Sequence, residues 1–193
     1  MRPIPATLFQ PYLLPGERIV WTGRPKQGVI LRPADAFLIP FSLLWLGFAL
    51  FWNIAVWTLP FEGEGPDPTF KLFGLPFLII GIYAVIGRFF HDAAIRKKLA
   101  YSLTDQRVLI VKGNRSAKLT SLDLHRLPNL ELNEHRDGTG TIIFEASGWS
   151  FFNPGHAAGM DLWVPSLGAS LQFFRIDNPR KVYQLIRENS ARS

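Results

Sequence analysis

Residues 36–59 have the sequence AFLIPFSLLWLGFALFWNIAVWTL, and residues 70–90 have the sequence FKLFGLPFLIIGIYAVIGRFF. The first run carries no charged side chain, and the second carries only Lys71 and Arg88, near its ends. At about 1.5 Å per residue, a helix over either run is on the order of 30 Å long, enough to cross the hydrocarbon core of a bilayer. The two runs therefore predict a membrane α-helical hairpin.

The charged residues around these runs predict how the hairpin is oriented. The connecting residues 60–69 carry only acidic charges. Seven basic residues flank the two outer ends of the pair: Arg24, Lys26, Arg32, Arg88, Arg96, Lys97 and Lys98. Because basic residues concentrate on the cytoplasmic side of a membrane, both termini are expected in the cytoplasm and residues 60–69 are expected to form an external acidic loop.

Small residues in the second run indicate a packing face. Gly74 and Gly81 are seven residues apart and share one side of the helix. Glycine allows helix backbones to approach closely, so this face packs either on the first span or on another copy of the chain. The alternative is that glycine is simply common in membrane helices. Neither run has an ionisable residue at its centre, which argues against transport by this chain alone.

The chain after the second span changes to strand and turn patterns. Residues 91–100 indicate a short basic helical linker, and six or seven short strands follow, the last two expected over 162–164 and 171–176. The clearest hairpin turn is at Asp137-Gly138. An amphipathic helix then begins at Pro179 and carries an apolar stripe of Val182, Leu185 and Ile186. The pattern predicts a mainly β soluble domain that ends in a helix.

Several segments of this domain resemble the bacterial pleckstrin-homology-like (PH-like) domain of small membrane proteins. The resemblance rests on YSLTDQRVLI at 101–110, GTGTI at 138–142, FRIDNP at 174–179, VYQLI at 182–186, and LPGERIVWTGRP at 14–25 before the first span. It implies a bent two-sheet barrel capped by the C-terminal helix, at the bacterial inner (cytoplasmic) membrane. It does not supply an activity, because this family is described by fold more than by function.

The expected organisation follows from these patterns. Residues 1–35 form a cytoplasmic N-terminal segment, 36–59 and 70–90 are the transmembrane helices joined by 60–69, 91–100 are a basic linker, and 101–193 form the PH-like domain. Ile19, Val20 and Trp21 either add a strand to that domain or lie along the membrane.

Basic residues are the candidate contacts with lipid headgroups or with a partner. They are Arg96, Lys97 and Lys98 after the second span and Arg107, Lys112, Arg115 and Lys118 around the first hairpin of the domain. In eukaryotic relatives of the fold this hairpin often binds phosphoinositides, but the dense basic signature is only partly present here. We expect weak attraction to anionic headgroups, and the alternative for each charge is a solvated surface.

Catalytic and metal-binding patterns are sparse. The chain has no cysteine, and its four histidines are scattered, so no metal site and no cofactor are expected. The excess basic charge flanks the spans, so nucleic acid is not an expected partner. An alternative is a membrane-bound enzyme that acts on a lipid or envelope precursor through residues 147–159, with His156 and Asp161 as catalytic candidates. The favoured hypothesis is a non-enzymatic binding or scaffold module that contacts a protein, another copy or lipid headgroups.

Overall fold

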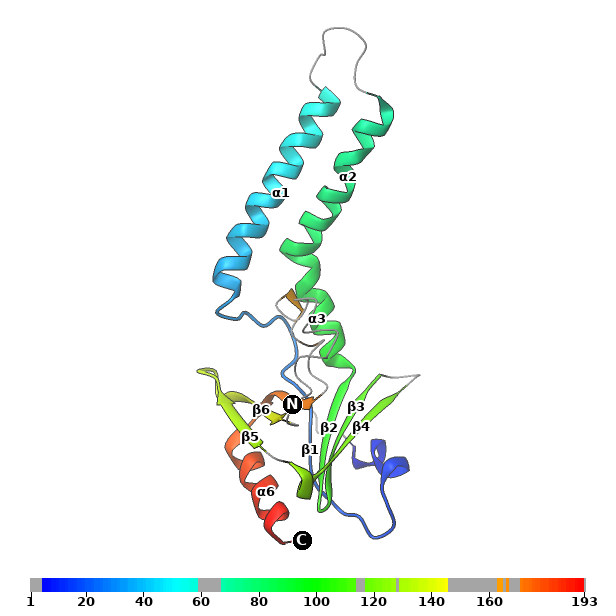
Figure 1. Ribbon diagram of the computed structural model, residues 1–193, viewed down its shortest axis with the longest axis vertical. Helices are drawn as coiled ribbons and strands as arrows, with labels where there is room; N and C mark the ends of the chain where they lie inside the picture. Colours follow the sequence, from blue (N-terminus) through cyan, green and yellow to red (C-terminus); the bar gives the residue numbers. More distant parts are fainter. Residues whose placement is uncertain are drawn as a thin grey trace. The chain divides into compact units, whose positions relative to one another are not determined.

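The computed structural model describes residues 5–58, 67–113, 117–127, 129–145, 163–164, 166 and 171–192. The chain divides into two compact units, each described by itself below. One unit combines Met1–Gly28 with Asp92–Ser193, and the other is the continuous segment Val29–His91. We call them the β unit and the helical unit (Figure 1).

The helical unit consists of two long apolar helices. Helix α1 covers Asp35–Thr58, and α2 covers Pro68–Ile82. A π-helical turn at Tyr83–Gly87 leads from α2 into α3, which covers Arg88–Lys97 and extends into the β unit. In the most apolar 18 residues of each helix, only 22% of α1 and 17% of the helix over Pro68–Lys97 is buried. The core helix of a soluble protein is, in contrast, mostly buried. Helix α1 and the continuous helix over Pro68–Lys97 are therefore long and apolar enough to span a membrane.

Close packing joins the two long helices along the predicted glycine face. A Cβ atom placed on Gly74 would lie 2.8 Å from the amide of Asn53, and one on Gly81 would lie 3.0 Å from Leu46 Cδ1. Asn53 and Leu46 both belong to α1, so the structure places both glycines against the first helix of the same chain. The amide of Asn53 also donates hydrogen bonds to the carbonyl oxygens of Ala49 and Gly74.

A buried ion pair joins the first turn of α1 to the start of α3. Arg88 donates to Asp35 Oδ1 at 2.8 Å, and both side chains are almost fully buried. The backbone N–H of Arg32 donates to the other carboxylate oxygen of Asp35 at 2.7 Å. The Asp35–Arg88 pair thus links the two ends of the helical unit at which the chain enters and leaves it.

The β unit contains two antiparallel sheets and a C-terminal helix. The first sheet has the order β1-β2-β3-β4, and the second has the order β5-β6-β7. The strands are β1 Ile19–Gly23, β2 Leu99–Thr104, β3 Arg107–Lys112, β4 Lys118–Asp123, β5 Asn129–Glu134, β6 Thr139–Glu145 and β7 Gln172–Asp177. Helix α6 covers Pro179–Arg192. The coarse prediction of a mainly β domain with a C-terminal helix is confirmed. The described strands form two separate sheets and do not close into one barrel.

One core joins both sheets to α6. It includes Tyr101 and Val108 from the first sheet and Phe144 and Phe173 from the second. Tyr101 and Phe173 have ring centroids 4.8 Å apart, in the range of favourable aromatic pairs. The predicted apolar stripe of α6 is confirmed, because its side chains pack in this core: Val182, Leu185 and Ile186.

Strand β1 comes from before the helical unit, yet it pairs with β2, which follows that unit. Its register places Trp21 opposite Leu103 and Gly23 opposite Tyr101. The Trp21 ring lies 5.3 Å from that of Phe173 in the second sheet. Of the two alternatives for residues 19–21, the structure therefore supports the added strand.

The structure differs from the sequence-based expectation at one strand boundary and at one expected strand. Strand β2 already begins at Leu99, two residues earlier than expected, because α3 ends at Lys97. The strand expected over 162–164 is absent from the described part of that segment, where Trp163 is helical and Val164 is irregular although buried. Apolar character there reflects burial rather than pairing with a neighbouring strand. The turn at Asp137-Gly138 is confirmed, with Gly138 at a φ of 77°.

Candidate functional site

The predicted basic candidates separate into two groups in the structure. Arg107 and Arg96 are engaged in buried polar networks, whereas the lysines lie at one end of the first sheet. Arg115 lies outside the described residues, as do most of residues 147–159, with His156 and Asp161.

Arg107 holds the N-terminal segment on the first sheet. Its Nε and one terminal nitrogen donate to the two oxygens of Glu17, each at 2.9 Å. The same terminal nitrogen donates to the carbonyl of Tyr12 at 2.7 Å. Glu17 also accepts from the hydroxyl of Thr104 and the N–H of Leu14, each at 2.7 Å. Arg107 therefore has a structural role, because its guanidinium forms hydrogen bonds with Glu17 and Tyr12 of the same chain.

The electrostatics of Glu17 follow from this network. Burial by itself would raise the pKa of the carboxyl, but the hydrogen bonds from Arg107, Leu14 and Thr104 and the Arg107 charge outweigh it. Together they lower the pKa of Glu17 to about 2. Hydrogen bonding to the charged form stabilises the carboxylate. Glu17 is therefore an ionised, fully partnered anion at neutral pH.

Arg96 is also internal. Its Nε donates to Asp92 at 2.9 Å, and its terminal nitrogens donate to the carbonyls of Lys26 and Gly28 at 2.6 and 2.7 Å. The side chain of Asp92 accepts in turn from the N–H and hydroxyl of Ser166. Arg96 is completely buried. Arg96 thus connects residues 26–28, where the chain leaves the β unit, to α3, where the chain enters it again.

The remaining lysines gather at the end of the first sheet where β2 and β4 begin. Lys112 and Lys118 are cross-strand partners, and the N–H of Gly113 donates to the carbonyl of Lys98 at 3.0 Å. We call Lys98, Lys112 and Lys118 the basic end; Lys97, the last residue of α3, is next to it. Burial and the charge of Lys118 lower the pKa of Lys112. Among the described residues, no carboxylate forms an ion pair with any of these four lysines.

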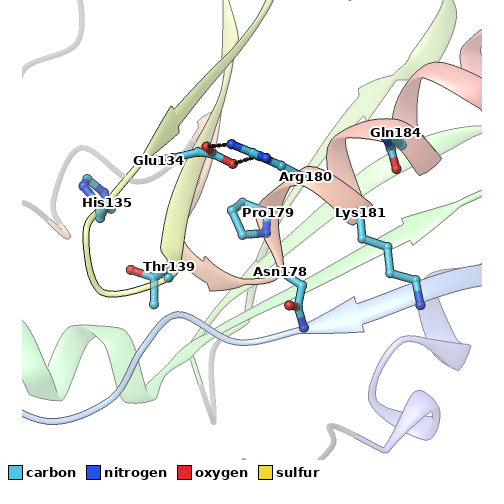
Figure 2. A pocket seen from close by; sticks show the side chains of 9 residues that line it. Glu134, His135, Thr139, Asn178, Pro179, Arg180, Lys181 and Gln184 are labelled. Carbon is cyan, nitrogen blue, oxygen red and sulfur yellow. Dashed lines mark hydrogen bonds and ion pairs between the residues drawn. The ribbon is translucent and has the colours of Figure 1, made fainter.

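A polar groove lies elsewhere on the β unit, between the β5–β6 turn and the start of α6 (Figure 2). Its volume is about 690 Å³, and it is open to solvent. Glu134 and Arg180 face each other across it, and Arg180 donates to both carboxylate oxygens of Glu134. His135 lies beside the turn, where burial and the charge of Arg175 lower its pKa. The charges of Glu134 and Arg180 thus neutralise each other, and Lys181 adds a further positive charge to the lining.

The described residues do not form a metal site, because no three His, Asp or Glu side chains among them lie close enough to share an ion. No protein family, no curated protein and no solved structure matched the chain in the comparisons. The basic end is therefore the candidate site that the geometry itself supports.

Sequence reasoning identified the lysines but missed the partners of the two arginines. Asp92 and Arg96 are four residues apart on one helix, which is a recognisable pairing pattern. Glu17 and Arg107, in contrast, are 90 positions apart and have no local signal. Only the pairing of β1 with the strands after the helical unit brings them together.

Proposed function

We propose that this chain is a membrane-anchored, non-enzymatic binding module. Its helical hairpin spans the bacterial inner membrane with both termini in the cytoplasm, and its β unit is a PH-like domain held at the cytoplasmic face. The large exposed apolar surface of both long helices supports the anchor. The basic flanks and acidic connection support the orientation.

The arrangement of the β unit supports a PH-like fold. Two antiparallel sheets share one core, and the C-terminal helix packs in it. The N–H of Lys26, just after β1, donates to the carbonyl of Arg175 in β7 at 2.8 Å. This hydrogen bond joins the first sheet to the second on one side, as a bent two-sheet barrel requires. The hairpin would then be an insertion between the first two strands of the domain.

The basic end is the part of the module that we propose contacts a ligand. Its lysines have no ion pair from the described residues, and Lys97 is the last residue of an apolar helix that covers Pro68–Lys97. Within the basic end, Lys98 is thus the next residue along the chain after this helix. Each lysine near an anionic leaflet contributes on the order of 1 kcal/mol of attraction. We propose that it binds anionic phospholipid headgroups; a protein partner or another copy is the alternative.

Orientation is tested by labelling single cysteines with a membrane-impermeant maleimide. The chain has no cysteine of its own, so one introduced residue gives an unambiguous signal. In intact right-side-out cells Glu62→Cys should react and Ser193→Cys should not, and in inverted membrane vesicles the pattern should reverse. Labelling of Ser193→Cys in intact cells would refute the proposed orientation.

Headgroup binding is tested on the full chain in nanodiscs, because a fragment from residue 92 onward would lack β1. An environment-sensitive fluorophore on Ala117→Cys, beside Lys118, should report a shift with anionic lipid that high salt removes. Lys112→Gln with Lys118→Gln should abolish the shift. Exposed basic residues away from the basic end supply the control, Arg126→Gln with Lys181→Gln, which should retain it. A shift that does not depend on lipid charge would favour a protein partner.

A further inference from the structure

The N-terminal residues 5–13 lie on the first sheet of the β unit, and the function proposed above does not use them. We call this segment the strap. It contains two short 3₁₀ turns, Ala6–Leu8 and Gln10–Tyr12. Phe9, between the two turns, is completely buried, whereas the residue on either side of it is exposed. Phe9 is therefore the one fully buried side chain that attaches the strap to the sheet.

The surface under Phe9 is apolar and is formed by three neighbouring strands. Phe9 packs in a small core with Ala100 of β2, Leu109 and Val111 of β3, and the partly buried Leu119 of β4. We call these four sheet residues the apolar patch. Val111 pairs with Ala100 on one side and with Leu119 on the other. Without the strap, this row of side chains would face water.

The apolar patch adjoins the basic end. Lys112 follows Val111 along β3, and Lys118 precedes Leu119 along β4. The two lysines pair with each other, so they form the next row of the sheet, about 3.3 Å away. Successive side chains alternate between faces, but a lysine carries its charge on a long flexible stem, which at the end of a sheet can turn toward either face. Apolar area next to basic charge is the combination that binds anionic bilayers.

The strap can leave the sheet without disturbing the rest of the N-terminal segment. Among the described residues, a single hydrogen bond joins the strap to the sheet, from Arg107 to the carbonyl of Tyr12 at 2.7 Å. Glu17, four residues beyond the strap, is held separately by Arg107 and Thr104. Gly16 lies between the two attachments at a φ of 81°, where glycine permits a hinge. Release of the strap thus leaves the Glu17 contacts and β1 in place.

The surroundings of the β unit decide whether release is favourable. In water, release exposes both Phe9 and the apolar patch, so the closed state is favoured. At an anionic bilayer the patch contacts lipid instead of water, and the adjacent lysines are attracted to the headgroups. In the closed state the strap covers the patch and prevents the apolar part of this contact. The bilayer therefore has a higher affinity for the open state, which is the condition for shifting the equilibrium.

We propose that the strap is an autoinhibitory cover that competes with an anionic phospholipid bilayer for the apolar patch. In the closed state Phe9 occupies the patch. In the open state the patch and the basic end contact the bilayer together. This inference deepens the proposed function and rests on it, since the ligand is the same anionic bilayer surface.

Release is measured by double electron–electron resonance between spin labels on Leu8→Cys, in the strap, and Gln184→Cys, an exposed residue of α6 in the same unit. The full chain is used in nanodiscs, and because it has no cysteine of its own the two labels are unique. Phosphatidylcholine alone should give one narrow distance distribution. Added phosphatidylglycerol should produce a second, broader population, and high salt should remove it.

One variant and its matched control test the role of Phe9. Phe9→Ala removes the buried attachment and should raise the ratio of open to closed chains by on the order of tenfold. Thr7→Ala changes an exposed residue of the same strap and should match the wild type. A ratio that Phe9→Ala leaves unchanged would overturn the proposal. Near-ultraviolet circular dichroism checks that Phe9→Ala is folded; if it is not, the wild-type response to anionic lipid decides alone.

The fluorophore on Ala117→Cys separates this inference from the proposed function. If anionic lipid shifts the fluorophore while the strap distance stays narrow, the basic end binds with the strap closed, and only the autoinhibition is refuted. If neither label responds to anionic lipid, headgroup binding is refuted together with the strap release that depends on it.

Discussion

Glu17 is a buried carboxylate that joins residues before the first span to residues after the second. It accepts from Arg107 and Thr104 in the first sheet and from the N–H of Leu14 in its own segment. A buried, hydrogen-bonded ion pair is costly to break from one side, since the remaining charge is left without compensation. The stability of the contacts around Glu17 thus depends on the ionisation of its carboxyl group.

Acid should therefore weaken the β unit through this residue. The pKa of Glu17 is about 2 in the folded state, below its ordinary value of 4.5. Its contribution is fully present well above pH 4.5 and is lost as the pH falls toward 2, and it amounts to about 3 kcal/mol. Glu17→Gln should lower the free energy of unfolding by that amount at pH 7 and flatten the loss between pH 4.5 and 2, measured by near-ultraviolet circular dichroism in detergent.

Glu188→Gln provides the matched control, because Glu188 is exposed on α6. It should leave both the stability at pH 7 and the acid profile close to wild type. An acid profile of Glu17→Gln that matches the wild type would show that other carboxylates dominate the response.

For single residues, the sequence shows where the charged side chains are along the chain but not which of them form buried ion pairs. Arg96 and Arg107 were grouped with the lysines as surface contacts because all lie in basic stretches. Apart from Asp92, the partners named above come from residues before the first span, Gly28 and Glu17 among them. A residue so far away along the chain becomes a neighbour only through β1, so no spacing rule could have identified it.

Elements were more predictable than contacts, because periodicity reports which face of an element is buried. The stripe on α6 packs in the core, and the two glycines of the second span lie against α1. The strand expected over 162–164 was wrong for the complementary reason. An apolar run shows that a segment is buried, but a strand also needs a neighbour with which its backbone can pair.

The glycine face of the hairpin predicts a sharp contrast between two positions. At Gly81 a Cβ would lie 3.0 Å from Leu46 Cδ1 and 3.2 Å from its Cα, whereas at Gly47 nothing lies within 4 Å. Gly81→Val should therefore force the helices apart and destabilise the hairpin by about 1 to 3 kcal/mol. Gly47→Val adds the same atoms on an open face and should be nearly neutral.

The measurement is thermal unfolding of the full chain in one detergent, followed by the far-ultraviolet helical signal. Equal midpoints for Gly81→Val and Gly47→Val would indicate that the helices are not in contact at Gly81.

The whole molecule is one β unit interrupted by a helical insertion. Of the described strands, the first precedes the insertion and the other six follow it. Contacts within the β unit connect the parts of the chain before and after the insertion. Trp21 pairs with Leu103, and Arg96 donates a hydrogen bond to the carbonyl of Gly28. A soluble form should thus be obtainable only when both parts are kept.

Replacing residues 29–91 by a flexible Gly-Ser linker should yield a folded, soluble protein, whereas residues 92–193 alone should not fold cooperatively. The physical reason is that β2 would expose an unpaired edge and the core would lose Trp21. Amide dispersion in nuclear magnetic resonance spectra distinguishes the two outcomes. Well-dispersed spectra from residues 92–193 alone would show that β1 is dispensable.

The position of β1 also has a consequence for how the protein is made. The ribosome releases β1 first, and its partner β2 follows only after both spans have been synthesised, a delay on the order of seconds. In the proposed topology, failure of the second span to insert would leave β1 and β2 on opposite sides of the bilayer, and the sheet could not form. A folded β unit would then require that both spans had inserted, and a misinserted chain would stay unfolded and accessible to quality-control proteases.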